Sequence, residues 1–304
     1  MIQHLLDGIL VGAILSLGAT GLTMVMHMLR FANFSHAELL SIGAYSALVF
    51  DQMFKSLMPI MATQIGPLSM TGALVLAMVL SMGVTGISAA LFDKLVFRRV
   101  REKGEELSMV FASFGLALII RNVIGLIFGL HTKLYSQDIV FATVLSRDPL
   151  ILVKPDQLAT LAITVLIMLS LHLLLSRTTF GYALRAVGEN SELAQINGVN
   201  LQRMIVTVWI LGGGLAALAG VFYGLTNQIT PVIGRDLVLP VFAATIVGGI
   251  GSIYGALLGG FIVGIAANLA LIILPSGYSP SVPFLIILLV LLIRPNGLFG
   301  EERT

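Results

Sequence analysis

Long runs of apolar residues alternate with short polar stretches along this 304-residue chain. A helix that crosses a bilayer needs about 20 apolar residues, and it satisfies its backbone polar groups internally. The sequence therefore predicts an all-α fold, a polytopic transmembrane helical bundle of about 8–10 spans that include broken or half helices. The expected spans are residues 5–28, 39–54, 68–92, 107–130, 158–175, 204–225, 253–274 and 282–293, with a short or half helix over 237–247.

The composition agrees with a membrane protein and excludes several other classes. Hydrophobic residues make up 57% of the chain and charged residues only 11%, whereas a soluble domain carries about 25% charged residues. Soluble, disordered and fibrous classes are therefore excluded. The absence of cysteine excludes a disulfide framework, thiol catalysis and Cys-ligated metals. We treat residues 1–304 as one transmembrane domain.

Most lysines and arginines gather in three places, namely residues 93–106, residues 177–203 and the C-terminal tail. Because loops rich in positive charge stay in the cytoplasm, we expect all three on the cytoplasmic side. Counting the spans between them then places the N-terminus outside. The first apolar run has no Lys or Arg before it and no small-residue cleavage site, so we expect a retained span and not a removed signal peptide.

Two polar or glycine-rich segments interrupt apolar runs at matching places in the two halves of the chain. Interrupted helices at such places point to a central site in transporters, because their free backbone ends can hold polar solutes. For the first segment an ordinary loop is the alternative, with Asn33 or Ser35 as helix N-cap and Ser35 with Glu38 as a capping box. The candidate residues of a translocation path are Asn33, Ser35, His36, Glu38, Thr245, Gly248, Gly249 and Gly251.

A few polar residues lie inside the expected spans. Arg121 and Asn122 interrupt the apolar run 107–130. A charge at this depth is costly, so Arg121 should face the bundle interior or a watery cavity unless it reaches the membrane surface. We expect His172 and Asn268 to make hydrogen bonds between helices.

Small residues recur four apart in two runs, at Gly8 and Gly12 and again at Gly251, Gly255 and Gly259. Such stripes let helix backbones approach closely where lipid supplies no hydrophobic drive. They predict tight helix packing, with a pore or a moving interface as the alternative.

The basic stretch 177–203 contains a segment that is typical of a short helix. Asn190 or Ser191 can cap its start, and Gly198 can adopt the left-handed conformation after its end. Its apolar residues would be exposed unless they dock on a partner or pack on the membrane face. The residues assigned to this docking helix are Glu189, Glu192, Leu193, Ala194, Ile196 and Gly198.

Several motifs are missing from the chain. It has no G-x-x-x-x-G-K-[ST] loop for ATP, no H-E-x-x-H or G-x-S-x-G motif, and no carboxylate pair within the apolar runs. It also lacks the row of intramembrane acids that ion-coupled carriers often use. We therefore expect no catalytic residues, no metal and no cofactor on this chain, and an energy source that lies elsewhere.

Three stretches carry a resemblance to a known family. They are residues 23–38, which end in Asn-Phe-Ser-His-Ala-Glu, residues 181–200, and residues 247–260 together with the ending Arg-Pro-Asn-Gly-Leu-Phe-Gly at 294–300. In this order and spacing the chain resembles the permease subunits of bacterial ABC importers for branched-chain amino acids, of the LivH type. It departs from the family pattern at Ala37, where the family usually has glycine.

The resemblance implies a set of partners and roles. The chain would pair with a second, LivM-like permease subunit or with its own copy, and with two ATP-binding subunits that hold ATP and magnesium. A periplasmic or lipid-anchored binding protein would deliver the substrate. Residues 189–198 would be the coupling helix, and the two interrupted segments would flank the path. The protein would lie in the bacterial inner membrane, surrounded by lipid, with no nucleic-acid partner.

Three other functions are weighed against this one. A permease for urea, short amides or other amino acids would share the same motifs. A facilitative channel would not need a cytoplasmic docking helix, so the segment 189–198 separates that possibility from an importer. An intramembrane enzyme would need a nucleophile with its base, or a metal site, and the sequence contains neither pattern.

Overall fold

The computed structural model describes residues 1–304 except 104–105, 137–141, 148–149, 295 and 301–304. Helices form nearly all of it, as the long apolar runs predict. In chain order the elements are α1 (Ile2–Leu29), α2 (His36–Leu57), the 3-10 turn η1 (Pro59–Ala62), α3 (Gly72–Phe92), the π-helical turn η2 (Asp93–Phe97), α4 (Arg98–Lys103), α5 (Glu106–Phe128), β1 (Thr143–Arg147), β2 (Leu150–Val153), α6 (Pro155–Arg177), α7 (Thr179–Glu189), α8 (Ser191–Ile196), α9 (Leu201–Thr226), α10 (Ile233–Gly248), α11 (Ile253–Ala270), the 3-10 turn η3 (Ser276–Ser281) and α12 (Val282–Ile293).

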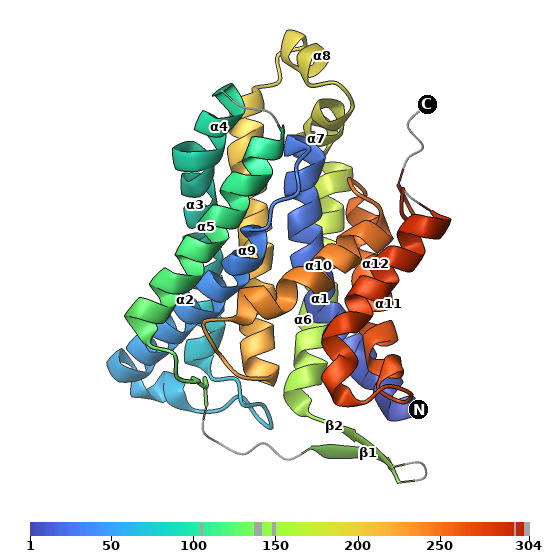
Figure 1. Cartoon of the computed structure of the whole chain (residues 1–304). Coiled ribbons are helices and arrows are strands. Elements are labelled where there is room, and N and C mark those ends of the chain that lie inside the picture. The colour runs from blue at the N-terminus through green and yellow to red at the C-terminus, as the bar shows by residue number, and fades with distance from the viewer. Residues whose placement is uncertain (104–105, 137–141, 148–149, 295, 301–304) are drawn as a thin grey trace.

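Six helices of the described chain are long and apolar enough to cross a membrane. They are α1, α3 with its continuation through η2 and α4, α5, α6, α9 and α11. The helices α2, α10 and α12 complete the bundle (Figure 1). The prediction of an all-α, multi-pass membrane bundle is therefore confirmed.

The two ends of the bundle differ in what they carry. The helices α4, α7 and α8 lie at one end, and the N-terminus lies at the other (Figure 1). The basic stretches 93–106 and 177–203 thus share an end, as the charge pattern predicts. A small antiparallel hairpin of β1 and β2 lies at the N-terminal end. Gln3 holds it there, because its side chain donates to the Leu152 carbonyl at 2.9 Å and accepts from the Leu152 amide at 3.0 Å.

Glycines set how closely the central helices approach. A Cβ atom at Gly264 of α11 would lie 2.5 Å from the Cα of Gly12 in α1, and a Cβ at Gly220 of α9 would lie 1.9 Å from the Leu40 carbonyl oxygen of α2. Backbone therefore packs on backbone at these crossings, so the predicted tight packing is confirmed. In the most apolar stretch of α1, 89% of the residues are buried, whereas in the corresponding stretches of α5 and α6 only 28% are. The core thus lies around α1, α2, α9 and α10, with α5 and α6 at the periphery.

The long apolar region 237–274 divides into two helices, with two differences from the expected bounds. α10 begins at Ile233, four residues earlier than predicted, because Arg235 and Asp236 fit its exposed first turn. α11 ends at Ala270 and not at 274. Between the two helices Gly249 and Gly251 have φ of 103° and 96°, a conformation that glycine adopts without strain.

Candidate translocation path and docking helix

The first interrupted segment is a polar loop buried inside the bundle. α1 ends at Leu29, and Arg30 leaves it in the left-handed conformation with φ of 55°. Asn33 and Ser35 are 0% and 2% exposed. The Asn33 side-chain oxygen accepts from the Ser35 amide at 3.1 Å and from the Ser35 hydroxyl at 2.7 Å. These local bonds turn the chain into α2 at His36.

The capping box predicted for Ser35 and Glu38 is wrong. Ser35 occupies the N-cap position of α2 but makes no side-chain cap hydrogen bond. Glu38 points away from the helix start, because its carboxylate binds the guanidinium of Arg121 on α5. A tertiary ion pair has therefore replaced the local bond.

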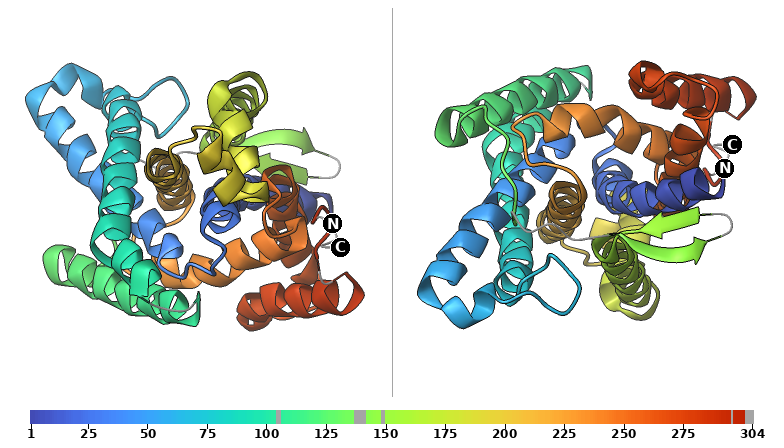
Figure 2. Two further views of the ribbon diagram at one scale, coloured as in Figure 1. Left: turned by 90° about the horizontal axis from the view of Figure 1, so that it is seen from above. Right: turned by 90° about the horizontal axis from the view of Figure 1, so that it is seen from below.

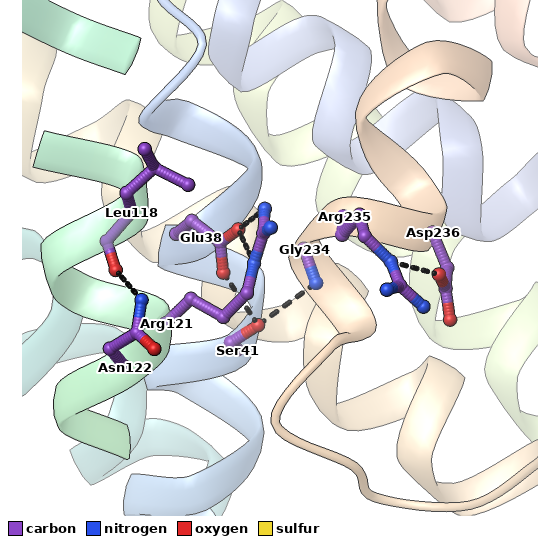
Figure 3. A network of polar contacts seen from close by, with 8 residues as sticks. All are labelled: Glu38, Ser41, Leu118, Arg121, Asn122, Gly234, Arg235 and Asp236. Atoms are coloured by element: carbon purple, nitrogen blue, oxygen red, sulfur yellow. Dashed lines mark hydrogen bonds and ion pairs between the residues drawn. The ribbon is translucent and has the colours of Figure 1, made fainter. Parts of the chain in front are cut away.

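Glu38 is the centre of a polar network that joins three helices (Figure 3). Arg121 Nε donates to Glu38 Oε1 at 2.9 Å, and the Ser41 hydroxyl lies 3.4 Å from Glu38 Oε2. The Gly234 amide of α10 donates to the Ser41 hydroxyl at 2.9 Å. The first turn of α10 thus lies against a carboxylate that is itself only 1% exposed. Arg121 faces the bundle, as the cost of a lipid-exposed charge predicts.

His36 and Phe34 hold the same loop against neighbouring helices. The His36 ring is fully buried against Gly21 of α1. The backbone of Gly18 is near the ring, but neither ring nitrogen has a hydrogen bond of normal geometry to any described residue. The Phe34 ring stacks on Phe242 of α10, with 4.8 Å between ring centroids.

The second interrupted segment is packed and capped. The Thr245 hydroxyl donates to the Val241 carbonyl of its own helix at 3.0 Å and lies 3.4 Å from the Ala19 carbonyl of α1. Gly248 packs on Gly255, and a Cβ at Gly249 would collide with Gly300.

The carbonyl groups at the end of α10 are also occupied. The Leu298 amide donates to the Val247 carbonyl at 2.9 Å, and the Phe299 amide donates to the Gly248 carbonyl at 3.1 Å. These carbonyls are therefore not free in the structure, because the C-terminal segment binds them.

The structure brings part of the two predicted segments together. Thr245 contacts Ala19, and His36 packs on Gly21, so both lie against the same turn of α1. Gly248 ends α10 one turn after Thr245, and Gly249 and Gly251 follow the helix. Gly251 lies against His27, near the C-terminal end of α1. Whether any of these residues contacts a solute stays a prediction.

The docking helix has the predicted local structure, with shorter bounds. Glu189 closes α7, and α8 spans Ser191–Ile196. Asn190 caps α8, because its side-chain oxygen accepts from the Glu192 amide at 3.1 Å and the Leu193 amide at 2.9 Å. Gly198 follows the helix with φ of 87°.

Two apolar side chains of α8 point to solvent at the end of the bundle that carries α4 and α7. Leu193 is 56% exposed and Ile196 is 82% exposed, whereas Ala194 is buried at 4%. α8 lies beyond the ends of the spanning helices (Figure 1). Its exposed apolar surface is thus available to a partner.

The family-level comparison decides what kind of protein this is. Residues 4–293 match the model of the family described as "Branched-chain amino acid transport system / permease component". The chain belongs to this family. As a member, it is a multi-pass permease of the inner membrane.

Relatives across the whole chain agree with this assignment. The permease is 30% identical to the high-affinity branched-chain amino acid transport system permease protein BraD of Pseudomonas aeruginosa, over 100% of this chain and 97% of the relative. It is 30% identical to the permease protein LivH of Escherichia coli K12, over 100% and 96%. A probable LivH of Methanocaldococcus jannaschii is also 30% identical, over 99% and 93%.

Two residues at the C-terminal end of α1, His27 and Arg30, connect the predicted segments, and the sequence did not predict this. Arg30 donates to the Gly188 carbonyl of α7 at 3.1 Å. A Cβ at Gly188 would lie 1.9 Å from His27 Nε2, and one at Gly251 would lie 3.2 Å from His27 Nδ1. The end of α1 is therefore held between the segment before α8 and the turn after α10. A lone histidine or arginine at a helix end carries no sequence motif, so only the structure shows this role.

Of the two other polar residues inside the spans, one makes the predicted hydrogen bond between helices and the other does not. His172 Nδ1 and the Tyr254 hydroxyl are 2.9 Å apart and join α6 to α11, as predicted. The prediction for Asn268 is wrong, because its amide donates to the Gly264 carbonyl of its own helix at 2.9 Å. A side-chain amide that donates to a carbonyl one turn earlier in its own helix does not need an acceptor on a neighbouring helix.

Proposed function

We propose that this permease is the membrane-spanning subunit of an ATP-driven importer for branched-chain amino acids, which it moves by alternating access. The names of three full-length relatives support the substrate class. The observation that carries the ATP-driven mode is α8, a capped helix with exposed apolar residues at the cytoplasmic end.

In this proposal α8 docks on an ATP-binding subunit. The sequence has no phosphate-binding loop of its own, so hydrolysis of ATP with its magnesium belongs to two partner subunits. A second permease subunit, LivM-like or another copy, completes the membrane part, and a binding protein delivers the substrate from outside. A helix that inserts Leu193 and Ile196 into a partner would gain about 1.5–3 kcal/mol for each fully buried side chain.

The contacts of α1 connect the segment before α8 to the part of the bundle that lies inside the membrane. Movement of α8 would displace Gly188, and through it His27 and Arg30 at the end of α1. The loop that follows α1 holds Asn33 and leads into Glu38, so the same movement reaches the buried network. A coupled change of this kind needs two arrangements of the bundle that the partners stabilise to different degrees.

A facilitative channel fits α8 less well. A channel needs no energy from a partner, and the exposed Leu193 and Ile196 would then remain uncovered. No feature of the structure favours urea or short amides over amino acids as substrates.

The test is transport by the complex reconstituted in liposomes with the partner subunits and binding protein encoded beside the gene. We expect uptake of leucine that requires ATP. The variant Ile196→Asp should assemble but lose ATP-dependent uptake, because a charge replaces the most exposed apolar contact of α8. Ile196→Leu is the matched control and should keep uptake. Leucine uptake that needs no ATP would contradict the importer, and full uptake by Ile196→Asp would contradict docking through α8.

A further inference from the structure

One face of the bundle carries exposed charges between apolar helices. α10 lies between α5 and α12 on the same side of the molecule (Figure 2). On α10, Arg235 and Asp236 have side chains that are 59% and 46% exposed. Most exposed residues of the flanking helices are apolar, with Asn122 of α5 as a polar exception. The apolar ones include Leu118, Ile119, Ile127, Leu285, Leu288 and Leu292.

The charged pair lies within the height of the bundle and not at its rim. The neighbouring Gly234 binds Ser41 of α2 through its amide. Leu40, next to Ser41, packs against Gly220 inside α9 and Gly18 inside α1. Both glycines are interior residues of spanning helices. The pair therefore lies at a depth where lipid would otherwise surround the protein.

Lipid is a poor cover for these two residues. Charged side chains at membrane depth almost always face a bundle interior or a water-filled cavity, and they mark solute pathways. The short Asp236 side chain cannot reach the membrane surface as a lysine or arginine can. The face must therefore meet water, with another protein on the far side to exclude lipid.

The pair also has hydrogen-bonding capacity to spare. Arg235 Nε donates to Asp236 Oδ1 at 3.2 Å, and within the described residues this is the only hydrogen bond of either side chain. Two guanidinium nitrogens and one carboxylate oxygen remain for a ligand. By contrast, Glu38 is occupied by Arg121 and Ser41, on the other side of Gly234 from the pair (Figure 3).

We propose that Arg235 and Asp236 bind the head group of a zwitterionic amino acid, in a water-filled path between this face and a second permease subunit. The Arg235 guanidinium binds the carboxylate of the ligand in a two-pronged, charge-assisted contact, and Asp236 binds its ammonium group. The apolar residues of α5 and α12 face the aliphatic side chain. This site rests on the proposed function and adds to it the recognition of the substrate's charged end.

The first test measures leucine uptake by the reconstituted complex, driven by leucine-loaded binding protein. Asp236→Asn and Arg235→Gln should each lower uptake about tenfold or more, because each removes one charge-assisted contact. ATP hydrolysis stimulated by the loaded binding protein should persist, because α8 is unchanged. Ser170→Ala removes an exposed hydroxyl from α6, outside this face, and should transport like the wild type.

The second test asks whether water reaches the pair. The chain has no cysteine, so Asp236→Cys introduces its only thiol. During ATP turnover this thiol should react with a charged methanethiosulfonate reagent, and leucine-loaded binding protein should slow the reaction. Leu166→Cys, 66% exposed in the middle of α6, should stay unreactive in lipid. Thr63→Cys, directly after the exposed η1 turn, should react throughout.

The outcomes separate this site from the proposed function. A wild-type complex that does not take up leucine contradicts the proposed function itself. Normal uptake by both charge-neutral variants of an active complex overturns the site. The site is also overturned if Asp236→Cys stays unreactive while Thr63→Cys is modified.

Discussion

The ion pair of Glu38 and Arg121 should attach the peripheral helix α5 to the bundle. Replacing Arg121 with Met leaves a carboxylate that is 1% exposed without its cation. Removing one partner of a buried pair costs about 3–5 kcal/mol in the free energy of unfolding. Glu38→Gln should cost less, about 1–2 kcal/mol, because the amide oxygen still accepts from the guanidinium. Arg121, with a side chain that is 24% exposed, also keeps access to solvent in that variant.

The assay is a double-mutant cycle on the purified protein, with the free energy of unfolding measured by denaturant titration in mixed micelles. The double variant removes both charges, so its cost should fall below the sum of the single costs by about 2 kcal/mol. Asn122→Ala is the neighbouring control. Among the described residues its amide bonds to the Leu118 carbonyl of α5 alone, at 2.7 Å, and its loss should change stability by about 0.5 kcal/mol or less. Strictly additive costs, or a cost for Arg121→Met like that of the control, would refute the attachment.

Three further changes test the packing and the coupling. Gly264→Ala places a Cβ 2.5 Å from the backbone of α1 and should cost about 1–3 kcal/mol in the same titration, whereas Gly83→Ala, with open space around it, should be neutral. Gly188→Ala places a Cβ 1.9 Å from the α1 histidine ring, so leucine uptake should fall several-fold while ATP hydrolysis continues, and equal losses of both activities would speak against a coupling role. Gly198→Val forces a β-branched residue into φ of 87°, at about 1–2 kcal/mol of strain, and should uncouple hydrolysis from uptake with insertion intact. Uptake at the wild-type rate by Gly198→Val would contradict the docking role of α8.

Features that depend on local chemistry could be predicted from the sequence. The spans follow from the apolar runs, and α8 follows from Asn190 as cap and Gly198 as the left-handed residue after the helix. The glycine stripes predicted close packing, because spacing alone places small residues on one face. The sequence does not predict which helix packs against each stripe, because no residue near the stripe specifies its partner.

Features that depend on distant partners could not be predicted. Ser35 and Glu38 match a capping box, yet Arg121, 83 residues away, takes the carboxylate. Arg235 and Asp236 resemble an ordinary polar loop ahead of an apolar run, yet they form the first turn of α10 within the bundle. In each case a tertiary contact overrides a sound local preference.

The backbone contact between α1 and α11 has a consequence for biosynthesis. About 220 residues separate these helices, and a ribosome needs roughly 11–45 s to make that length at about 5–20 residues per second. During this time the glycine face of α1 lacks its final neighbour and must be covered by lipid, by the insertion machinery or by provisional contacts. Chains that stop before α11 cannot close the core around α1, so quality-control proteases should recognise them even when most of their spans are already inserted.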